Sequence, residues 1–211
     1  MIDLVIKVLA AYLLGSIMGG LVVGKLRGGV DIRSAGSGNP GATNAWRTQG
    51  PVFGLLVFVI DVGKGILATL VLPYLPLPLA AEDAALRLWT PYLCGLAVML
   101  GHVYPVYFGF RGGKGVATLI GVWACLLPQA LPYALVTWAV VLVLSGYVSL
   151  ASLSAGVVLS LAAILLGAAK AGVFFAIATT LLLCYTHRLN LQRLREGSEH
   201  RFRKVMLFRR G

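Results

Sequence analysis

Seven apolar runs, separated by short polar segments, make up most of the chain. Most approach the length of about 20 residues that an α-helix needs to cross the hydrocarbon core of a bilayer. The pattern predicts an all-α integral membrane protein with about seven transmembrane helices, over residues 2–24, 51–72, 89–110, 115–127, 133–145, 149–167 and 171–186. The fourth and fifth runs are short, and Pro128 and Pro132 could instead break a re-entrant segment.

Loop charges predict the orientation, because cytoplasmic loops carry an excess of Lys and Arg. With seven helices, one side holds Lys25, Arg27, Arg33, Arg47, Arg111, Lys114 and the basic residues from Arg188 to Arg210. The other side holds Asp3, Glu82, Asp83, Arg87 and Lys170. We therefore expect the N-terminus outside and the C-terminus in the cytoplasm. The predicted unit is one polytopic domain, 1–211, with cytoplasmic loops 25–50, 111–114 and 146–148 and a tail, 187–211.

Composition narrows the possible partners. The chain is 59% hydrophobic, and 18 Lys and Arg against 7 Asp and Glu give a net charge of +11. In a membrane protein whose cations lie in loops, this charge suits anionic lipid headgroups or an anionic substrate, and no nucleic-acid motif accompanies it. Cys94, Cys125 and Cys184 fall in apolar runs without metal-ligand spacing. We predict no metal site, no cofactor and no obligate protein partner.

The first polar stretch, residues 34–47, is rich in small and hydrogen-bonding residues. Its glycines allow backbone N–H groups to converge on an anion, and Arg47 adds a fixed charge. Neutral side-chain donors accompany them. The candidate substrate-binding residues here are Gly38, Asn39, Gly41, Thr43 and Asn44, beside Ser37 and Arg47. A flexible loop of turn-forming residues explains the same composition.

The second stretch, Arg111-Gly112-Gly113-Lys114-Gly115, opens a predicted helix. A Gly-rich backbone, a lysine and a helix N-terminus together favour phosphate. A nucleotide-binding P-loop is excluded, because position 108 is Phe and Gly115 replaces the Ser or Thr that holds magnesium. The alternative is a tight interhelical turn with cations that reach the membrane surface.

The third stretch begins where the last apolar run ends. Its candidates are His187 and Asn190, with Arg188 and Arg193 as substrate-binding cations and Glu199 in a structural role. If the helix continues, His187 and Asn190 lie on one face. A basic segment that binds anionic lipid is the alternative, which we prefer for residues 201–210, although lipid binding needs neither the histidine nor the asparagine.

Two charged residues lie inside the second apolar run, where ionisable groups are costly and mark pairing or function. Asp61 and Lys64 are three residues apart on the predicted helix. We predict a structural ion pair, with substrate binding by Lys64 as the second possibility. His102 is interpreted as a hydrogen-bonded core histidine.

Taken together, the stretches resemble one family. Ser37-Gly-Asn-Pro-Gly-Ala-Thr-Asn44 with Arg47, Gly112-Gly-Lys-Gly-Val-Ala-Thr118, and His187-Arg-Leu-Asn190 with Arg193, Gly197 and Glu199 are similar to the bacterial acyl-phosphate:glycerol-3-phosphate acyltransferases. The likeness includes the segments 61–65 and 147–152 and covers essentially the whole chain. The other large class of glycerophosphate acyltransferases carries His with Asp five residues later, and none of the three histidines here is followed in that way.

The resemblance implies transfer of a fatty acyl group from acyl phosphate to the 1-position of sn-glycerol 3-phosphate, giving lysophosphatidic acid and phosphate as the first step of bacterial phospholipid synthesis. It implies a multi-pass protein of the bacterial cytoplasmic (inner) membrane, with the active site facing the cytoplasm. Ser37, Arg47, His187 and Asn190 are then catalytic. Gly112, Gly113, Lys114 and Gly115 bind glycerol 3-phosphate, and Ser152 is a further contact.

The residues leave a mechanism and an alternative function open. We expect direct attack by the glycerol hydroxyl rather than an acyl-serine on Ser37, because acyl phosphate is already activated. The alternative function is a membrane transporter of an organic phosphate. Its site would lie near the midplane at helix breaks in symmetric repeats, whereas the polar residues here fall in segments predicted on one surface.

Overall fold

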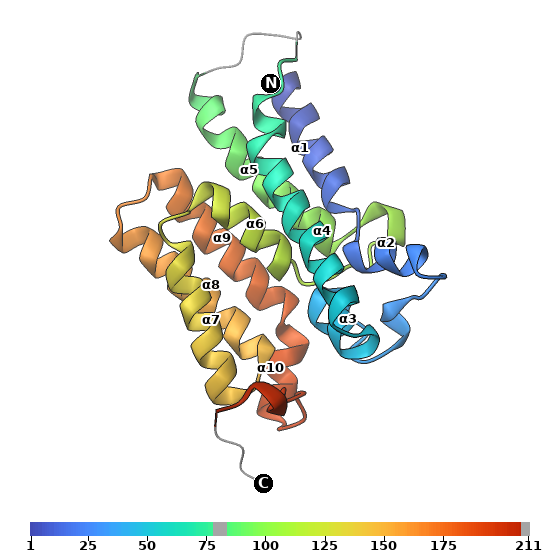
Figure 1. Ribbon diagram of the computed structural model, residues 1–211. Helices are drawn as coiled ribbons and strands as arrows, with labels where there is room; N and C mark the ends of the chain where they lie inside the picture. Colours follow the sequence, from blue (N-terminus) through green and yellow to red (C-terminus); the bar gives the residue numbers. More distant parts are fainter. Residues whose placement is uncertain (78–83, 208–211) are drawn as a thin grey trace. The chain divides into compact units, whose positions relative to one another are not determined.

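The computed structural model describes residues 1–77 and 84–207, and every regular element within them is helical (Figure 1). The α-helices are α1 (Ile2–Gly15), α2 (Gly19–Leu26), α3 (Ala42–Gln49), α4 (Pro51–Leu70), α5 (Ala84–Val103), α6 (Val116–Leu126), α7 (Leu131–Ser145), α8 (Val148–Leu165), α9 (Lys170–Thr186) and α10 (Arg188–Arg195). Short 3-10 helices are η1 (Ile32–Ser34), η2 (Leu72–Tyr74), η3 (Val106–Phe108) and η4 (Arg203–Val205). The all-α prediction is confirmed.

The chain divides into two compact units, residues 1–126 and 127–211. Helices α1 to α6 form the first unit, and α7 to α10 form the second. The boundary falls in the predicted turn between the fourth and fifth apolar runs, where Pro132 starts α7. The expectation of one polytopic domain over 1–211 stays a prediction.

In the first unit, α1 packs on α5, and α4 packs on α3, α5 and α6. The α1–α5 contact depends on a small residue in α1. A Cβ atom at Gly15 would lie 2.2 Å from the carbonyl oxygen of Val98 in α5, so only glycine lets the backbones approach this closely. A buried cluster of Val23, Ile32, Ala45, Phe53 and Val57 joins α2, η1, α3 and α4, so the first polar stretch is packed against the helices rather than loose.

The first apolar run is broken in two. Helices α1 and α2 meet at residues 16–18 with a bend of 49°. Near the N-terminus, Asp3 lies buried in α1 rather than in a loop, and its carboxylate is 2.8 Å from the ammonium of Lys7. Lys7 also donates to the Pro73 carbonyl at 2.8 Å. The buried pair ties α1 to η2, and its charges do not count toward a loop bias.

The third apolar run also ends earlier than its hydrophobicity predicts. Helix α5 stops at Val103 rather than continuing to residue 110. Pro105 disfavours helical backbone at the residue before it, and Gly109 adopts left-handed backbone with φ of 63°. Residues 104–115 therefore form a connection that turns the chain back toward the end of α5.

The second unit is built on a helical hairpin and a bent helix. Helices α7 and α8 are joined at Gly146, whose φ of 76° ends α7, and α9 packs on α8. Helices α9 and α10 meet at His187 with a bend of 58°. The tail is anchored on the hairpin, because Phe202 N donates to Gly146 O at 2.7 Å and Leu207 N donates to Val143 O at 3.1 Å.

Each of the seven apolar runs contains a helix, but these helices differ in whether they are long enough to cross a membrane. Three spans are long and apolar enough to cross a membrane within the described residues, and two more follow if each bent pair counts as one span. Helix α6 has 11 residues and α7 has 15, so they extend only about 16 and 22 Å at 1.5 Å per residue. The seven-span count and the orientation stay predictions. Glu82, Asp83, Arg209 and Arg210 lie outside the described residues.

Candidate active site

The first polar stretch is shaped by Asn44 of α3. Its side-chain oxygen accepts from Ser37 N at 2.9 Å, and its nitrogen donates to the carbonyls of Ile32 and Ala35, both at 3.0 Å. Asn44 is buried, so these bonds fix the loop from inside. Asn44 therefore holds Ser37 in place, and its predicted contact with substrate stays a prediction.

The predicted convergence of backbone N–H groups in this loop needs correction. Gly38 N donates to Ala35 O at 3.1 Å, and Gly41 N donates to the side-chain oxygen of Asn39 at 3.3 Å. Together with Ser37 N, three of the N–H groups stabilise the loop itself. Its groups for an anion are the Ser37 and Thr43 hydroxyls, which belong to exposed residues, and the half-buried Arg47.

Arg33, at the start of the same stretch, is neutralised locally. Its guanidinium lies 2.7 Å from a carboxylate oxygen of Asp31. The side-chain hydrogen bond lowers the pKa of Asp31 and raises the pKa of Arg33 from their ordinary values. The pair keeps its charges at neutral pH, so Arg33 adds little net charge to the site.

The glycine loop, defined as residues 111–115, lies against the end of α5. Gly113 N donates to His102 O at 3.0 Å, and Gly112 N donates to Val103 O at 3.2 Å. These two N–H groups, which the sequence assigned to phosphate, are used to hold the loop. The candidate groups for an anion are the half-buried Lys114 ammonium and the first turn of α6, where the helix dipole favours negative charge.

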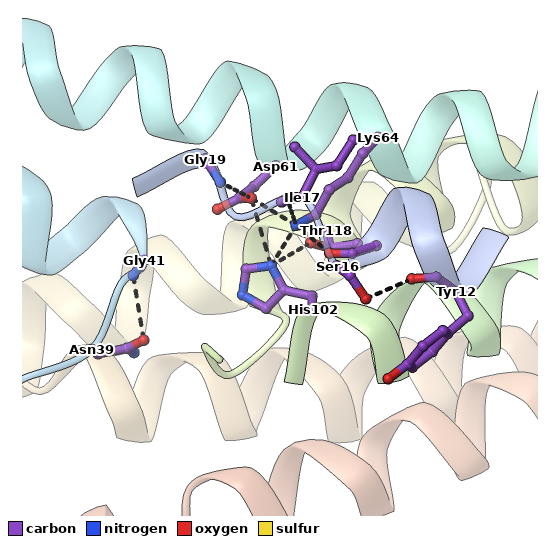
Figure 2. Close-up of polar contacts among 11 residues, drawn as sticks. Tyr12, Ser16, Ile17, Gly19, Asn39, Gly41, Asp61, Lys64, His102 and Thr118 are labelled. Carbon is purple, nitrogen blue, oxygen red and sulfur yellow. Dashed lines mark hydrogen bonds and ion pairs between the residues drawn. The ribbon is translucent and has the colours of Figure 1, made fainter. Parts of the chain in front are cut away.

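Beneath the glycine loop lies a buried polar cluster from α4, α5 and α6, shown in Figure 2. The Lys64 ammonium is 2.9 Å from the Asp61 carboxylate and 2.8 Å from Nδ1 of His102. Thr118 Oγ1 lies 3.2 Å from the same Nδ1. The predicted ion pair and the predicted core histidine are both confirmed. Substrate binding by Lys64, which is 3% exposed, stays a prediction.

In the second unit, His187 occupies the bend between α9 and α10. Helix α9 ends at Thr186, as the seventh apolar run predicted, so the condition that the helix continues through His187 is not met. Nδ1 of the buried ring lies 2.9 Å from Leu183 O, and a carbonyl oxygen can only accept. The neutral ring therefore carries its proton on Nδ1, which makes Nε2 its basic nitrogen.

Asn190 is held by Glu199 from beyond the end of α10. The amide nitrogen of Asn190 donates to Glu199 Oε1 at 2.6 Å, and Arg193 Nε donates to Glu199 Oε2 at 2.8 Å. Ser149 of α8 donates to Oε1 at 2.8 Å. Burial works to raise the pKa of Glu199, but the hydrogen bonds from Arg193, Asn190 and Ser149 outweigh it and hold the pKa below its ordinary value. The contacts agree with the structural role predicted for Glu199.

Ser149 was missed from the sequence, although it lies three residues before Ser152 on a predicted helix. Ser152 donates to Val148 O at 2.9 Å and accepts from the Trp138 indole at 3.3 Å. Arg188 donates to Tyr185 O at 3.0 Å, and its guanidinium stacks over the Tyr185 ring at 4.3 Å. Substrate contacts by Ser152 and Arg188 stay predictions.

The candidate residues thus fall into two groups. The first unit holds the Ser37–Arg47 stretch and the glycine loop, and the second unit holds His187, Asn190 and Glu199. Within the described residues, no group of three or more His, Cys, Asp and Glu side chains could hold a metal ion. Cys94 is buried, and Cys125 and Cys184 are half-buried.

Comparisons with known proteins agree over nearly the whole chain. A family model described as glycerol-3-phosphate acyltransferase matches residues 5–197. Enzymes of that name from Aquifex aeolicus and Desulforudis audaxviator are each 43% identical, over 92% and 91% of this chain and 97% and 92% of their own lengths. A crystal structure of the integral membrane glycerol 3-phosphate acyltransferase PlsY, in its glycerol 3-phosphate form, is 42% identical with a TM-score of 0.84, over 94% of this chain and 95% of that one. The lysophosphatidic acid form is 41% identical with a TM-score of 0.82, over 94% of each chain.

Proposed function

The chain belongs to the glycerol-3-phosphate acyltransferase family, and on that premise we propose that its donor is an acyl phosphate and its acceptor the 1-hydroxyl of sn-glycerol 3-phosphate. The protein is an all-helical integral membrane acyltransferase that forms lysophosphatidic acid. Membership of this family decides against the transporter of an organic phosphate. Acyl phosphate as donor is supported by the mixture of cationic groups and apolar helices, which suits an anion with a fatty tail.

The observation that carries the proposal is the pair of acceptor atoms around α10. With its proton on Nδ1, His187 has Nε2 as a hydrogen-bond acceptor, and Asn190, whose nitrogen donates to Glu199, has its amide oxygen as an acceptor. Both side chains are buried, and they lie three residues apart, about one helical turn. Acceptor groups suit an alcohol substrate, because a hydroxyl donates its proton in a hydrogen bond and attacks through its oxygen.

Each of the two loops of the first unit binds one phosphate group through a cationic residue. Lys114, with the first turn of α6, binds the phosphate of glycerol 3-phosphate. Arg47 binds the phosphate of the donor, and the Ser37 hydroxyl donates to the acyl carbonyl oxygen, where negative charge develops during attack.

Transfer is direct in this mechanism. The glycerol oxygen forms a bond to the acyl carbon, the bond between that carbon and the donor's phosphate oxygen breaks, and inorganic phosphate leaves with the electron pair. His187 and Asn190 orient the attacking hydroxyl, whose proton passes to a phosphate oxygen of the donor. Holding two reactants in attack geometry can lower a barrier by about 7–11 kcal/mol, so an activated donor needs no covalent enzyme intermediate.

Direct transfer is tested by rapid mixing of the purified enzyme with acyl phosphate. Without glycerol 3-phosphate, we expect no stoichiometric burst of inorganic phosphate, and phosphate release should begin when the acceptor is added. A burst accompanied by an acyl group on Ser37 in mass spectra would establish an acyl-enzyme instead. An acyl thioester supplied as the only donor should give no lysophosphatidic acid, and product formation from it would contradict the proposed donor.

The site is further proposed to face the cytoplasm, in the cytoplasmic membrane of a bacterium, with seven spans and the N-terminus outside. The loop charges support this orientation. In a variant without the three native cysteines, Ser34→Cys and Ser198→Cys should react with an impermeant thiol reagent only from the cytoplasmic side. Ala169→Cys, at the start of α9, should react only from outside. Labelling of positions 34 and 198 from opposite sides would overturn a single site.

A further inference from the structure

The buried Asp61–Lys64 pair closes the break between α1 and α2, as Figure 2 shows. The Lys64 ammonium donates to Gly15 O at 2.9 Å and to Ile17 O at 2.8 Å, and Asp61 accepts from Gly19 N at 3.3 Å. A cation thus caps the C-terminal end of α1 and an anion caps the N-terminal end of α2, in the sense that each helix dipole favours. The pair is therefore fixed by backbone on both sides.

The His102 ring is held by this pair. Nδ1 of His102 lies 2.8 Å from Lys64 Nζ and 3.5 Å from a carboxylate oxygen of Asp61, so both members of the pair contact the same ring nitrogen. The Thr118 hydroxyl, at the start of α6, lies 3.2 Å from the same nitrogen. With the ring 2% exposed and one nitrogen held from two helices, its position is set by the core.

The opposite edge of the ring lies against the glycine loop. A Cβ atom built on Gly113 would be 2.2 Å from Nε2 of His102, closer than nonbonded atoms approach, and 3.1 Å from Cδ2. Gly113 N also donates to the backbone oxygen of His102 at 3.0 Å. The loop thus rests on both the backbone and the ring of His102, and the next residue along the chain is Lys114.

We propose that His102 is a positioning residue for glycerol 3-phosphate. Its ring transmits the fixed geometry of the Asp61–Lys64 pair to Gly113 and thereby sets where the Lys114 ammonium meets the phosphate. Gly113 is glycine because the ring occupies the space of a side chain. This inference rests on the proposed binding of glycerol 3-phosphate by Lys114.

The buried Asp61–Lys64 pair also supports the first polar stretch. Gly20 follows the capped Gly19, and a Cβ atom on it would lie 2.1 Å from the carbonyl oxygen of Pro40. The Ser37–Arg47 stretch is therefore seated on α2 one residue from the Asp61 contact. One buried cluster thus braces both loops of the first unit.

The test is a compensating pair of substitutions in the full-length enzyme. Gly113→Ala should raise the KM for glycerol 3-phosphate on the order of tenfold, the effect of misplacing one charge-assisted hydrogen bond, with the KM for acyl phosphate unchanged. His102→Asn keeps a polar atom where Nδ1 stands and removes the edge that meets Gly113. Added to Gly113→Ala, it should recover most of the lost affinity, a coupling expected between contacting residues.

Two controls separate this contact from general loosening of the loop. Gly112→Ala meets the backbone oxygen of His102 instead, at 2.1 Å, so His102→Asn should not relieve it. His102→Gln keeps an atom near the Nε2 position and should not relieve Gly113→Ala. If Gly113→Ala is too unstable for kinetic assays, its melting temperature is measured instead of KM. Adding His102→Asn should then raise the melting temperature, and adding His102→Gln should not.

The outcomes are distinct. Relief of Gly113→Ala by His102→Asn alone supports the inference. An unrelieved rise in KM, or equal relief of Gly112→Ala, would overturn it while leaving the proposed function intact. If Gly113→Ala changed only the KM for acyl phosphate, the assignment of this loop to glycerol 3-phosphate would fail, and the positioning role with it.

Discussion

Asp61 and Glu199 are two carboxylates that each hold several neighbours, in very different surroundings. Asp61 is 0% exposed and pairs with Lys64, whose side chain is 3% exposed. The Glu199 side chain is 8% exposed and pairs with Arg193, whose side chain is 41% exposed. The first network is sealed inside the helices of one unit, whereas the second reaches the surface through the Arg193 guanidinium.

The two networks, which differ in exposure, also hold different groups in place. The Asp61 network fixes backbone, namely the helix break and the glycine loop proposed to bind substrate. The Glu199 network fixes the amide of Asn190, which we assign to the reacting centre. We therefore expect the first network to serve binding and the second to serve the reaction.

Asp61→Asn should be the most damaging single change. It leaves the Lys64 ammonium buried without its counter-charge, and breaking a buried pair by removing one partner costs about 3–5 kcal/mol. Thermal unfolding in detergent should show a large fall in melting temperature. Adding Lys64→Met should recover part of it, because no uncompensated charge is then buried. An Asp61→Asn protein as stable as the unsubstituted one would refute the role of the pair.

Glu199→Gln should affect the reaction more than stability. The charge that accepts from Asn190 and Arg193 is lost, and hydrogen bonds to charged groups are worth about 1.5–3 kcal/mol, so kcat should fall roughly tenfold to a hundredfold. The matched control is Glu196→Gln, an exposed residue nearby whose carboxylate accepts from Gln192 at 2.8 Å. It should behave as the unsubstituted enzyme. Equal losses in both variants would contradict a specific role for Glu199.

Acid should release the Glu199 network. Because its folded-state pKa is lowered, the stability it contributes is fully present above its ordinary pKa of 4.5 and is lost as the pH falls through the lower folded value. The melting temperature of the unsubstituted protein should therefore drop more between pH 5 and pH 3 than that of Glu199→Gln. Parallel pH profiles for the two proteins would show that Glu199 is not the group responsible.

The smallest effect is expected for the exposed pair at the start of the first polar stretch. Asp31→Asn removes the charge that pairs with Arg33, and exposed ion pairs contribute about 1 kcal/mol or less. The melting temperature should fall slightly, and less at high salt. A loss as large as that of Asp61→Asn would erase the distinction between buried and exposed pairs.

Hydrophobic runs were sufficient to predict the apolar helices, but not their breaks or the polar helices α3 and α10. Hydropathy does not distinguish a continuous helix from α1 and α2 bent at residues 16–18, because the capping groups, Lys64 and Asp61, come from another helix. The bend at His187 was missed because the residues on both sides of it are compatible with a helix. Spacing did predict the Asp61–Lys64 pair, since residues three apart share a helix face.

The site could be predicted as a set of residues but not as a set of contacts. Gly112 and Gly113 were singled out for N–H groups that the structure bonds to α5. Whether a glycine supplies an N–H donor or leaves room for a neighbour depends on the residue opposite it. Here that neighbour is the His102 ring, whose position no local sequence pattern predicts. Ser149 was missed because its partner, Glu199, is 50 residues away in the sequence.

The most direct test of the division between binding and reaction is calorimetric titration of glycerol 3-phosphate into Lys114→Ala and Asn190→Ala. We predict that Lys114→Ala weakens binding at least tenfold, about the loss of one charge-assisted hydrogen bond, while Asn190→Ala binds with nearly the unsubstituted Kd but has lost its activity. Weak binding by Asn190→Ala together with unchanged binding by Lys114→Ala would contradict the account.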